Sequence, residues 1–172
     1  MDTNKPSLGG AVAIVVGPEP KHETVLVLDE KRRNPEWKFP GGGTELSDTF
    51  IIDPVTKKKI SITDKRVIAI QTAIRELEEE TGLEPMKRNG QICAHHIGVL
   101  YRSDKKGYTH YICVEVDTFA TLKERGNEGE LVKKCTFEEI HDGRVQILKY
   151  HKDFIDPLRK QLMHSCNQLV NS

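Results

Sequence analysis

Residues 64–81 carry the pattern that most restricts how this chain can fold. Their apolar residues recur at helical intervals: Val67, Ile70, Ile74 and Leu77. Such spacing places apolar side chains on one face of an amphipathic helix. Thr63 or Asp64 can cap its start, and Gly82 stands where a left-handed residue commonly ends a helix. The sequence therefore predicts a helix over residues 64–81 that buries this stripe against another element.

The C-terminal half of the same helix, "RELEEETG" at residues 75–82, carries a cluster of carboxylates. At about 100° per residue, Glu76, Glu79 and Glu80 share one face, beside the apolar stripe. Carboxylates at these spacings repel one another, and near a helix C-terminus they also oppose the macrodipole. A hard divalent cation would reverse that repulsion. The helix alone leaves open the alternative of a solvated acidic surface.

The stretch "PGGGTE" at residues 40–45 predicts a glycine turn whose backbone can approach an anion closely. Glycines have no Cβ to obstruct that approach. Taken alone, such a stretch is commonly only a turn. Beside an acidic face suited to a metal ion, it favours chemistry on a phosphate-bearing substrate.

The remaining sequence predicts short strands and a second helix. Strands are expected at residues 9–17, 23–32, 91–102, 108–119 and 131–137, the second antiparallel to the first. A hairpin is predicted at about 47–63, where "TFII" and "KISIT" flank the turn sequence "DPVTKK". A helical turn at "FEEIHD" and a helix within 151–170 complete the order. The length of 172 residues favours a single α/β domain, residues 1–172. Because the elements do not alternate as βαβ units, we expect a mixed sheet with helices on both faces.

The composition excludes several classes of protein. The 172 residues have a formal net charge of zero, so no overall basic field favours nucleic acid or anionic membranes. The longest apolar run is too short to cross a bilayer, and the first residues do not form a secretory signal. The four cysteines, at 93, 113, 135 and 166, lack Cys-x2-Cys spacing and are expected as free thiols. We therefore expect a cytoplasmic protein.

Residues 40–45 and 75–83 resemble the two halves of the Nudix box. That signature of the MutT-like Nudix hydrolases is Gly-x5-Glu-x7-Arg-Glu-U-x-Glu-Glu-x-Gly-U, where U is a bulky aliphatic residue. Every specified position of its second half is matched: Arg75, Glu76, Leu77, Glu79, Glu80, Gly82 and Leu83. The lead-in "VLVLDEKRRNPEWKFPGGG" is also similar to that of the family. The resemblance covers roughly residues 10–140 and implies a Nudix-type α/β/α sandwich with a mixed β-sheet.

The chain departs from the family pattern between the two halves of the box. The usual first Gly precedes the Arg by 14 residues, whereas Gly42 precedes Arg75 by 33, so about 19 residues are inserted. This insertion is the predicted hairpin, which either leans over the cleft or projects into solvent. Counting back from Arg75 puts Val67 where the first Glu belongs. Glu45 or Asp64 could take the role of that Glu.

The resemblance implies a hydrolase of a nucleoside diphosphate linked to another moiety. A dinucleoside polyphosphate, a nucleotide sugar or an NTP would be cleaved with Mg²⁺ or Mn²⁺ as cofactor. Glu76, Glu79 and Glu80 would bind the metal, with Glu79 also catalytic, and Arg75 would orient a neighbouring carboxylate. In the later loop "RGNEGE" (125–130), Glu130 is preferred over Glu128 as general base. For Glu128 and Glu130, the alternative is that both are surface charges. For the whole protein, the alternative is a non-catalytic Nudix-fold sensor that binds a nucleotide.

Further residues are expected to bind the substrate, which would be a small nucleotide. They are Gly41, Gly42, Gly43, Arg33, Trp37 and Tyr101. Trp37 would stack on a base or pack in the core. Tyr101 follows Leu83 at a spacing similar to that of a Tyr in dinucleoside-polyphosphate hydrolases. We expect no membrane partner, and no nucleic-acid partner other than a capped RNA end. The sequence leaves open whether the protein forms a homodimer.

Overall fold

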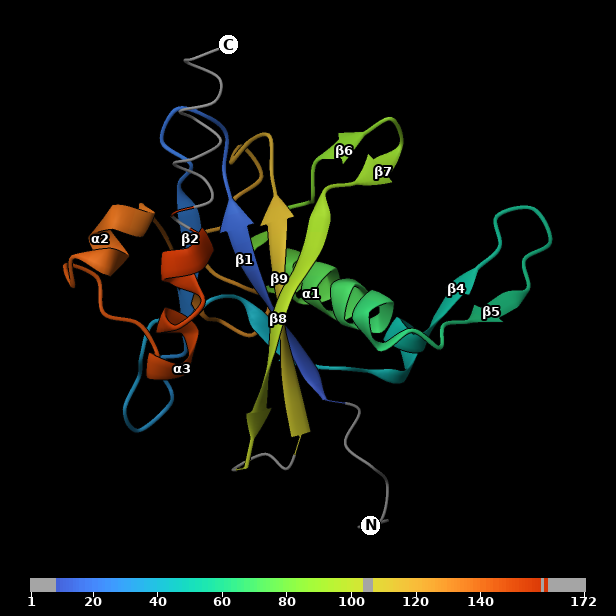
Figure 1. Ribbon diagram of the computed structural model, residues 1–172, viewed down its shortest axis with the longest axis horizontal. Coiled ribbons are helices and arrows are strands. Elements are labelled where there is room, and N and C mark those ends of the chain that lie inside the picture. Colours follow the sequence, from blue (N-terminus) through green and yellow to red (C-terminus); the bar gives the residue numbers. More distant parts are fainter. Residues whose placement is uncertain (1–8, 104–106, 159, 161–172) are drawn as a thin grey trace.

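A four-stranded mixed sheet forms the centre of the molecule (Figure 1). The structure, a computed structural model, describes residues 9–103, 107–158 and 160. The strands lie in the order β3 (Gly41–Gly43), β1 (Gly10–Val16), β9 (Gly107–Glu115) and β8 (Ala94–Arg102). β1 runs parallel to β9 and antiparallel to β3, and β8 runs antiparallel to β9. The apolar, β-branched sequence of β1 is buried along nearly its whole length, as a central strand covered on both faces requires.

Helix α1 (Lys65–Thr81) covers one face of this sheet and confirms the predicted helix. The Asp64 side chain accepts the N–H of Arg66 at 2.9 Å and caps its start. Gly82 ends it with a φ of 77°, a conformation that glycine adopts without strain. Leu77 is fully buried against the sheet, whereas Val67 is 42% exposed at the start of the helix. The buried stripe therefore fixes which way the acidic face of α1 points.

The opposite face is covered by two further strands and two short helices. β2 (Thr24–Leu28) pairs antiparallel with β10 (Leu131–Cys135), and α2 (Phe137–His141) and α3 (Lys149–Lys152) follow. β2 thus has its ladder with β10 and not with β1, the strand before it. A second apolar cluster fills this side, where Tyr111 stacks on Phe154 with ring centroids 3.8 Å apart. The mixed sheet between two layers is the α/β fold that the sequence predicts.

The C-terminal helix and the four cysteines predicted from the sequence lie only partly within the described residues. Residues 155–158 are helical after α3, and the rest of the helix predicted within 151–170 lies outside the described residues apart from residue 160. Cys93, Cys113 and Cys135 are buried free thiols, and Cys166 lies outside the described residues. No helix in the described part of the chain is long and apolar enough to span a membrane.

Two small ribbons stand apart from the central sheet. β6 (Lys87–Arg88) pairs with β7 (Gln91–Ile92) beyond the end of α1. A 3-10 turn, η1 (Leu46–Thr49), leads into β4 (Phe50–Ile52), which pairs with β5 (Lys59–Ser61). The β4–β5 ribbon lies where the sequence predicts a hairpin and projects away from the body beyond the start of α1 (Figure 1). Of the two alternatives for this hairpin, the structure has the one in which it points into solvent.

Candidate active site

The glycine stretch and the acidic end of α1 lie directly against each other. The glycines form the edge strand β3, not the free turn that their sequence predicts. The N–H of Gly41 donates a hydrogen bond to Glu80 Oε1 at 3.0 Å, so this amide is engaged by a carboxylate within the protein. A Cβ on Gly42 would overlap the carboxylate of Glu76. Residues that are far apart in the sequence thus lie in contact, and a side chain at position 42 would have to displace the Glu76 carboxylate.

This close approach predicts that Gly42→Ala severely impairs the site. The added methyl group must displace the Glu76 carboxylate, and shifts of about 1 Å within an active site can lower catalytic rates by about 100-fold. Gly43→Ala is a matched control, because a Cβ there would meet only the Gly9 carbonyl oxygen, at 4.0 Å. Metal-dependent turnover of the two variants checks this. Equal turnover would show that the contact between Gly42 and Glu76 is unimportant.

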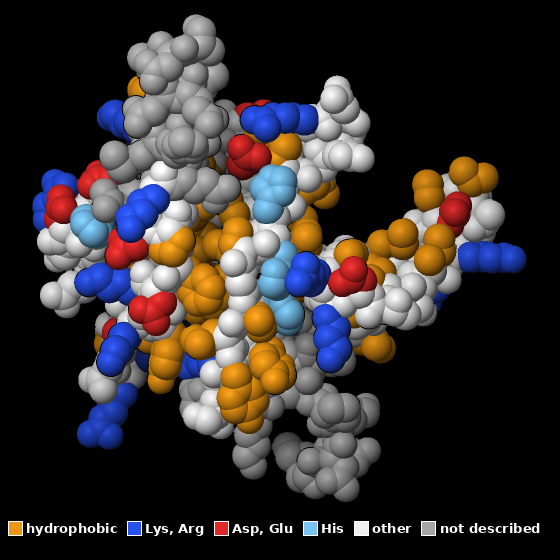
Figure 2. Space-filling model, viewed as in Figure 1, with side chains coloured by type: hydrophobic (Ala, Val, Ile, Leu, Met, Phe, Trp, Pro, Cys, Tyr) orange, Lys and Arg blue, Asp and Glu red, His pale blue; other side chains and the backbone are white. Residues whose placement is uncertain are grey.

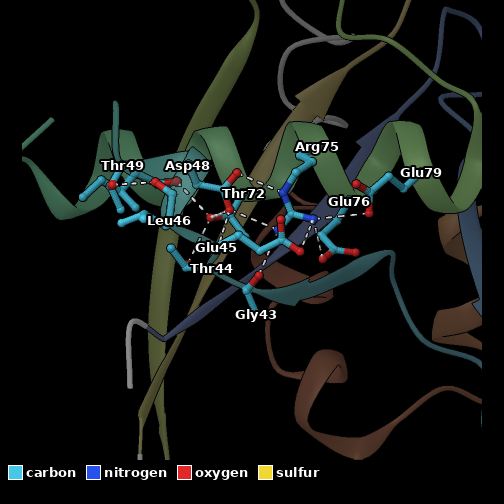
Figure 3. Close-up of polar contacts among 11 residues, drawn as sticks. Gly43, Thr44, Glu45, Leu46, Asp48, Thr49, Thr72, Arg75, Glu76 and Glu79 are labelled. Atoms are coloured by element: carbon cyan, nitrogen blue, oxygen red, sulfur yellow. Dashed lines mark hydrogen bonds and ion pairs between the residues drawn. The ribbon is translucent and has the colours of Figure 1, made fainter. Parts of the chain in front are cut away.

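Arg75 connects the site to the start of the β4–β5 ribbon (Figure 3). Its Nε and Nη2 donate to the two oxygens of Asp48 at 2.9 and 3.0 Å. Nη2 also donates to the Gly43 carbonyl at 2.9 Å. Nη1 donates to Glu76 at 3.1 Å and to Glu79 at 3.2 Å. The guanidinium therefore links the glycine strand, the helix carboxylates and η1 through hydrogen bonds.

Asp48 is a site residue that the sequence reasoning missed. Its side chain is only 4% exposed, and it also accepts the Glu45 N–H at 2.9 Å and the Thr72 hydroxyl at 3.0 Å. Burial alone would raise the pKa of the Asp48 carboxyl. Hydrogen bonds from Arg75, the Glu45 amide and Thr72 outweigh that effect and hold the pKa below its usual range. Asp48 is thus a buried, ionised partner for Arg75.

The signal for Asp48 was present in the sequence. Counting forward from Gly42 puts Asp48 at the position of the first signature Glu, whereas counting back from Arg75 gives Val67. The other two candidates for that role are placed differently. Asp64 caps α1, and Glu45 is 63% exposed and reaches Arg75 Nη1 at only 3.7 Å. The extra residues therefore follow the carboxylate and do not replace it.

Burial dominates the electrostatics of the helix carboxylates. It raises the pKa of Glu80, whose residue is 8% exposed, to about 8, although the Gly41 amide and the charge of Lys38 act in the opposite direction. Burial also raises the pKa of Glu76, which shares a side-chain hydrogen bond with Glu80. Without a cation, this pair therefore retains a proton near neutral pH. A divalent ion would displace that proton, because metal ligands bind in their deprotonated form.

The raised pKa predicts how the stability of the metal-free protein depends on pH. The pKa of Glu80 is higher in the folded protein than its ordinary value of 4.5. Its contribution to stability is therefore complete below pH 4.5 and is lost as the pH rises through about 8. Thermal melts in EDTA should show this decline, and Glu80→Gln should flatten it. Glu78→Gln, on the exposed side of α1, should leave it unchanged. An identical decline in all three proteins would contradict the assignment.

The loop before β10 brings Glu130 to the end of α1. The N–H of Asn127 donates to the Glu79 carbonyl at 2.9 Å, and the N–H of Lys123 donates to the Thr81 carbonyl at 2.9 Å. These bonds satisfy carbonyls that a helix C-terminus leaves without partners. Glu130 packs on Gly126, and its Oε2 is buried without a hydrogen-bond partner among the described residues. A buried carboxylate oxygen of this kind calls for a hydrogen-bond donor or a cation.

A cleft of about 800 Å³ opens over these groups. Its lining includes all three glycines of β3, Glu76, Glu79, Glu80, Glu128 and Glu130. Three cations also line it, namely Arg32, Lys38 and Arg102. The cleft thus combines carboxylates suited to a metal ion with cations suited to phosphate oxygens.

Three residues predicted to bind substrate do not line this cleft. Trp37 packs beside the apolar core, with Lys133 Nζ 5.4 Å from its ring centroid. Tyr101 is 56% exposed and lies edge-on to Tyr108, the cross-strand neighbour that lines the cleft in its place. Arg33 is exposed, and its neighbour Arg32 lines the cleft. Strand pairing and loop geometry, which spacing alone does not reveal, decide these positions.

The residues present fit a hard divalent ion. The site offers carboxylate oxygens, which Mg²⁺ and Mn²⁺ prefer, and one of them, Glu130 Oε2, is buried without a partner in the described chain. No three acidic, His or Cys side chains among the described residues form a ready cage. Mg²⁺ does not require one, since it commonly keeps several waters and binds one or two carboxylates together with substrate phosphates.

Solved structures with the same fold include several Nudix proteins. The NUDIX domain of Shewanella oneidensis NrtR, complexed with ADP ribose, is 16% identical with a TM-score of 0.60, covering 92% of this chain and 90% of that one. A C. elegans Ap4A hydrolase is 16% identical with a TM-score of 0.58, covering 91% and 98%. A MutT structure, from a study of the Aliivibrio salmonicida and Vibrio cholerae proteins, is 16% identical with a TM-score of 0.53. It covers 91% of this chain and 97% of that one. No protein-family model matches the sequence, and no curated protein does. The chain therefore has the Nudix fold that its sequence resemblance implies.

Proposed function

We propose that this protein is a divalent-metal-dependent Nudix pyrophosphohydrolase that cleaves a nucleoside diphosphate linked to another moiety. The observation that carries the proposal is the contact between β3 and α1. The Gly41 amide binds Glu80 there, and Gly42 leaves room for the Glu76 carboxylate. On this fold, that contact joins the two stretches that resemble the halves of the Nudix box.

Each side chain of the site has a distinct role in this proposal. Glu76, Glu79 and Glu80 would hold Mg²⁺ or Mn²⁺. The ion supplies charge neutralisation on the pyrophosphate and makes a bound water more acidic. Arg75, fixed by Asp48, holds the helix carboxylates in place. The Gly43 carbonyl accepts a further hydrogen bond from the Arg75 guanidinium.

Glu130 is proposed as the general base that accepts the proton of the attacking water. Its loop is hydrogen-bonded to the end of α1, and it lines the cleft beside Glu80. General-base catalysis commonly contributes about 10²–10⁴-fold, so Glu130→Gln should lower kcat by about 100-fold or more. Glu128→Gln in the same loop is the control and should retain most activity, because Glu128 is exposed. If Glu128→Gln proves the more damaging change, the two roles are exchanged.

The substrate proposed is a small nucleotide with at least two phosphates. Lys38 faces the acidic cluster closely enough to act on the Glu80 charge, and Arg32 and Arg102 line the same cleft. These cations are suited to the phosphates that flank the bond being cleaved. Dinucleoside polyphosphates, nucleotide sugars and NTPs all present such groups. The buried free thiols Cys113 and Cys135 suit a reducing compartment, and we place the protein in the cytoplasm.

A substrate panel tests the proposal against a purely binding role. The protein is incubated with Mg²⁺ or EDTA and with nucleotide sugars, dinucleoside polyphosphates, NTPs and capped RNA, and the products are separated by chromatography. Cleavage at a pyrophosphate bond that depends on Mg²⁺ is expected for at least one class. Tight binding of a nucleotide without turnover of any member would overturn the hydrolase and favour a sensor.

A further inference from the structure

The β4–β5 ribbon, residues 50–61, forms an arm that extends from the body of the protein (Figure 1). Its two strands pair with each other and not with the central sheet. An isolated two-stranded hairpin is marginally stable in water unless it packs on something else. The arm is therefore a surface for which a partner is expected.

The apolar side chains of the arm are exposed on both of its faces. Ile51 and Ile60 are directly opposite on one face and are 47% and 46% exposed. Ile52, on the other face, is 50% exposed, and Val55 at the tip is 87% exposed. Figure 2 shows the apolar atoms extending along the arm to its end. Exposed apolar groups gathered in one segment mark an interaction site.

The charge of the arm is positive, although the net charge of the whole chain is zero. Three consecutive lysines, Lys57, Lys58 and Lys59, follow the tip. The one carboxylate in the arm, that of Asp53, accepts the amide N–H groups of Val55 and Thr56 at 2.8 Å each and so shapes the turn. The expected partner is therefore both anionic and able to cover apolar groups.

Among a second copy of this chain, a nucleic acid, a protein surface and a lipid bilayer, these features favour the bilayer. The lysines of two arms would repel one another, which disfavours pairing of the arms of two copies of this chain. A nucleic acid would neutralise the lysines but leave the apolar tip uncovered. A flat protein surface would cover one face of the arm only. The interface of a lipid bilayer surrounds an inserted tip on all sides.

We propose that the arm docks on an anionic lipid bilayer. Val55 and the adjacent Pro54 enter the boundary between headgroups and acyl chains, and the three lysines contact the anionic headgroups. The strand edges keep unpaired backbone groups, which the hydrocarbon core does not tolerate, so insertion stops at the interface. An apolar tip beside a basic cluster combines buried apolar area with attraction to anionic lipids, the two contributions that set the strength of interfacial binding. The inference does not rest on the proposed hydrolase activity.

Vesicle sedimentation with the full chain tests this inference. The protein should bind phosphatidylcholine vesicles that contain phosphatidylserine at least about tenfold more strongly than phosphatidylcholine alone, and added salt should weaken the binding. Val55→Asp and the double variant Lys57→Glu/Lys59→Glu should each abolish the preference. Ile92→Asp is the matched control, because Ile92 is 43% exposed on the other small ribbon, beside Lys87 and Arg88. Thermal melting verifies that each variant is folded.

Several results would overturn the docking role of the arm. Equal binding to the two kinds of vesicle, or equal binding by wild type and Val55→Asp, would contradict it. Retention on immobilised polyglutamate as strong as on the anionic vesicles would assign the arm to an acidic protein. A dimer in sedimentation velocity that Val55→Asp dissociates would assign the arm to a second copy.

Discussion

Glu80→Gln is expected to lower metal-dependent turnover by about 10³-fold or more. Glutamine has nearly the shape of glutamate and retains an oxygen for the hydrogen bond from Gly41, so the packing of α1 on β3 is preserved. What is lost is a negative charge in a site that is only 8% exposed. Charge stabilisation by a bound ion is worth several kcal/mol, and each ~1.4 kcal/mol corresponds to a factor of ten in rate. Steady-state kinetics at saturating Mg²⁺ give the value.

Glu78→Gln supplies the control for this experiment. It removes the same charge from the same helix, at an exposed position that does not line the cleft. Turnover should therefore stay within a few-fold of wild type, since a distant exposed charge is screened by solvent. If the two variants lose activity equally, the loss reflects the overall charge of the helix and not metal binding at Glu80.

Arg75→Ala is expected to destabilise the protein by about 3–5 kcal/mol, the usual cost of leaving a buried charge without its partner. Asp48 is 4% exposed and would lose both of its hydrogen bonds from the guanidinium. Glu76 and Glu79 would also lose the cation that lies between them and Asp48. Because the pKa of Asp48 lies below 3.8 in the wild type, its contribution is lost only as the pH falls below that value, so the loss should be larger at pH 7 than near pH 3. Urea unfolding at the two pH values measures it.

Arg125→Ala is the corresponding control for an exposed pair. Arg125 contacts Glu30 at 3.3 Å with both side chains at least half exposed, and such pairs contribute about 0.2–1 kcal/mol. A loss for Arg75→Ala no greater than that for Arg125→Ala would mean that Asp48 and the helix carboxylates do not depend on the guanidinium. The hydrogen bonds from Arg75 on α1 to Asp48 on η1 would then contribute little to stability.

The helical part of the site could be predicted from the sequence because its signals are local. The apolar stripe, the cap at Asp64 and the glycine at position 82 together specify α1 within one residue of its observed start. Once Leu77 is buried, helical geometry alone fixes where Glu76 and Glu80 point. Asp48 could also have been found, since the spacing from Gly42 is the family spacing when counted forward.

Other features depend on contacts that no local pattern records. The pairing of β2 with β10 joins segments about a hundred residues apart. The choice of Arg32 over Arg33 for the cleft depends on the path of one loop. Likewise, the sequence around Gly41 predicts a turn, but pairing with Val12 on β1 places Gly41 in the edge strand β3. Sequence spacing predicts which residues share an element, and tertiary contacts decide which elements share a site.

Mn²⁺ binding, followed by electron paramagnetic resonance, tests most directly whether the glycine strand and the acidic helix form one metal site. Wild type, Glu80→Gln, Gly42→Ala and the control Gly43→Ala are titrated in the absence of nucleotide. Binding should weaken by about tenfold or more in Glu80→Gln and in Gly42→Ala, and it should stay near the wild-type value in Gly43→Ala. Binding of equal strength in all four proteins would contradict the account, because the ion would then be held elsewhere.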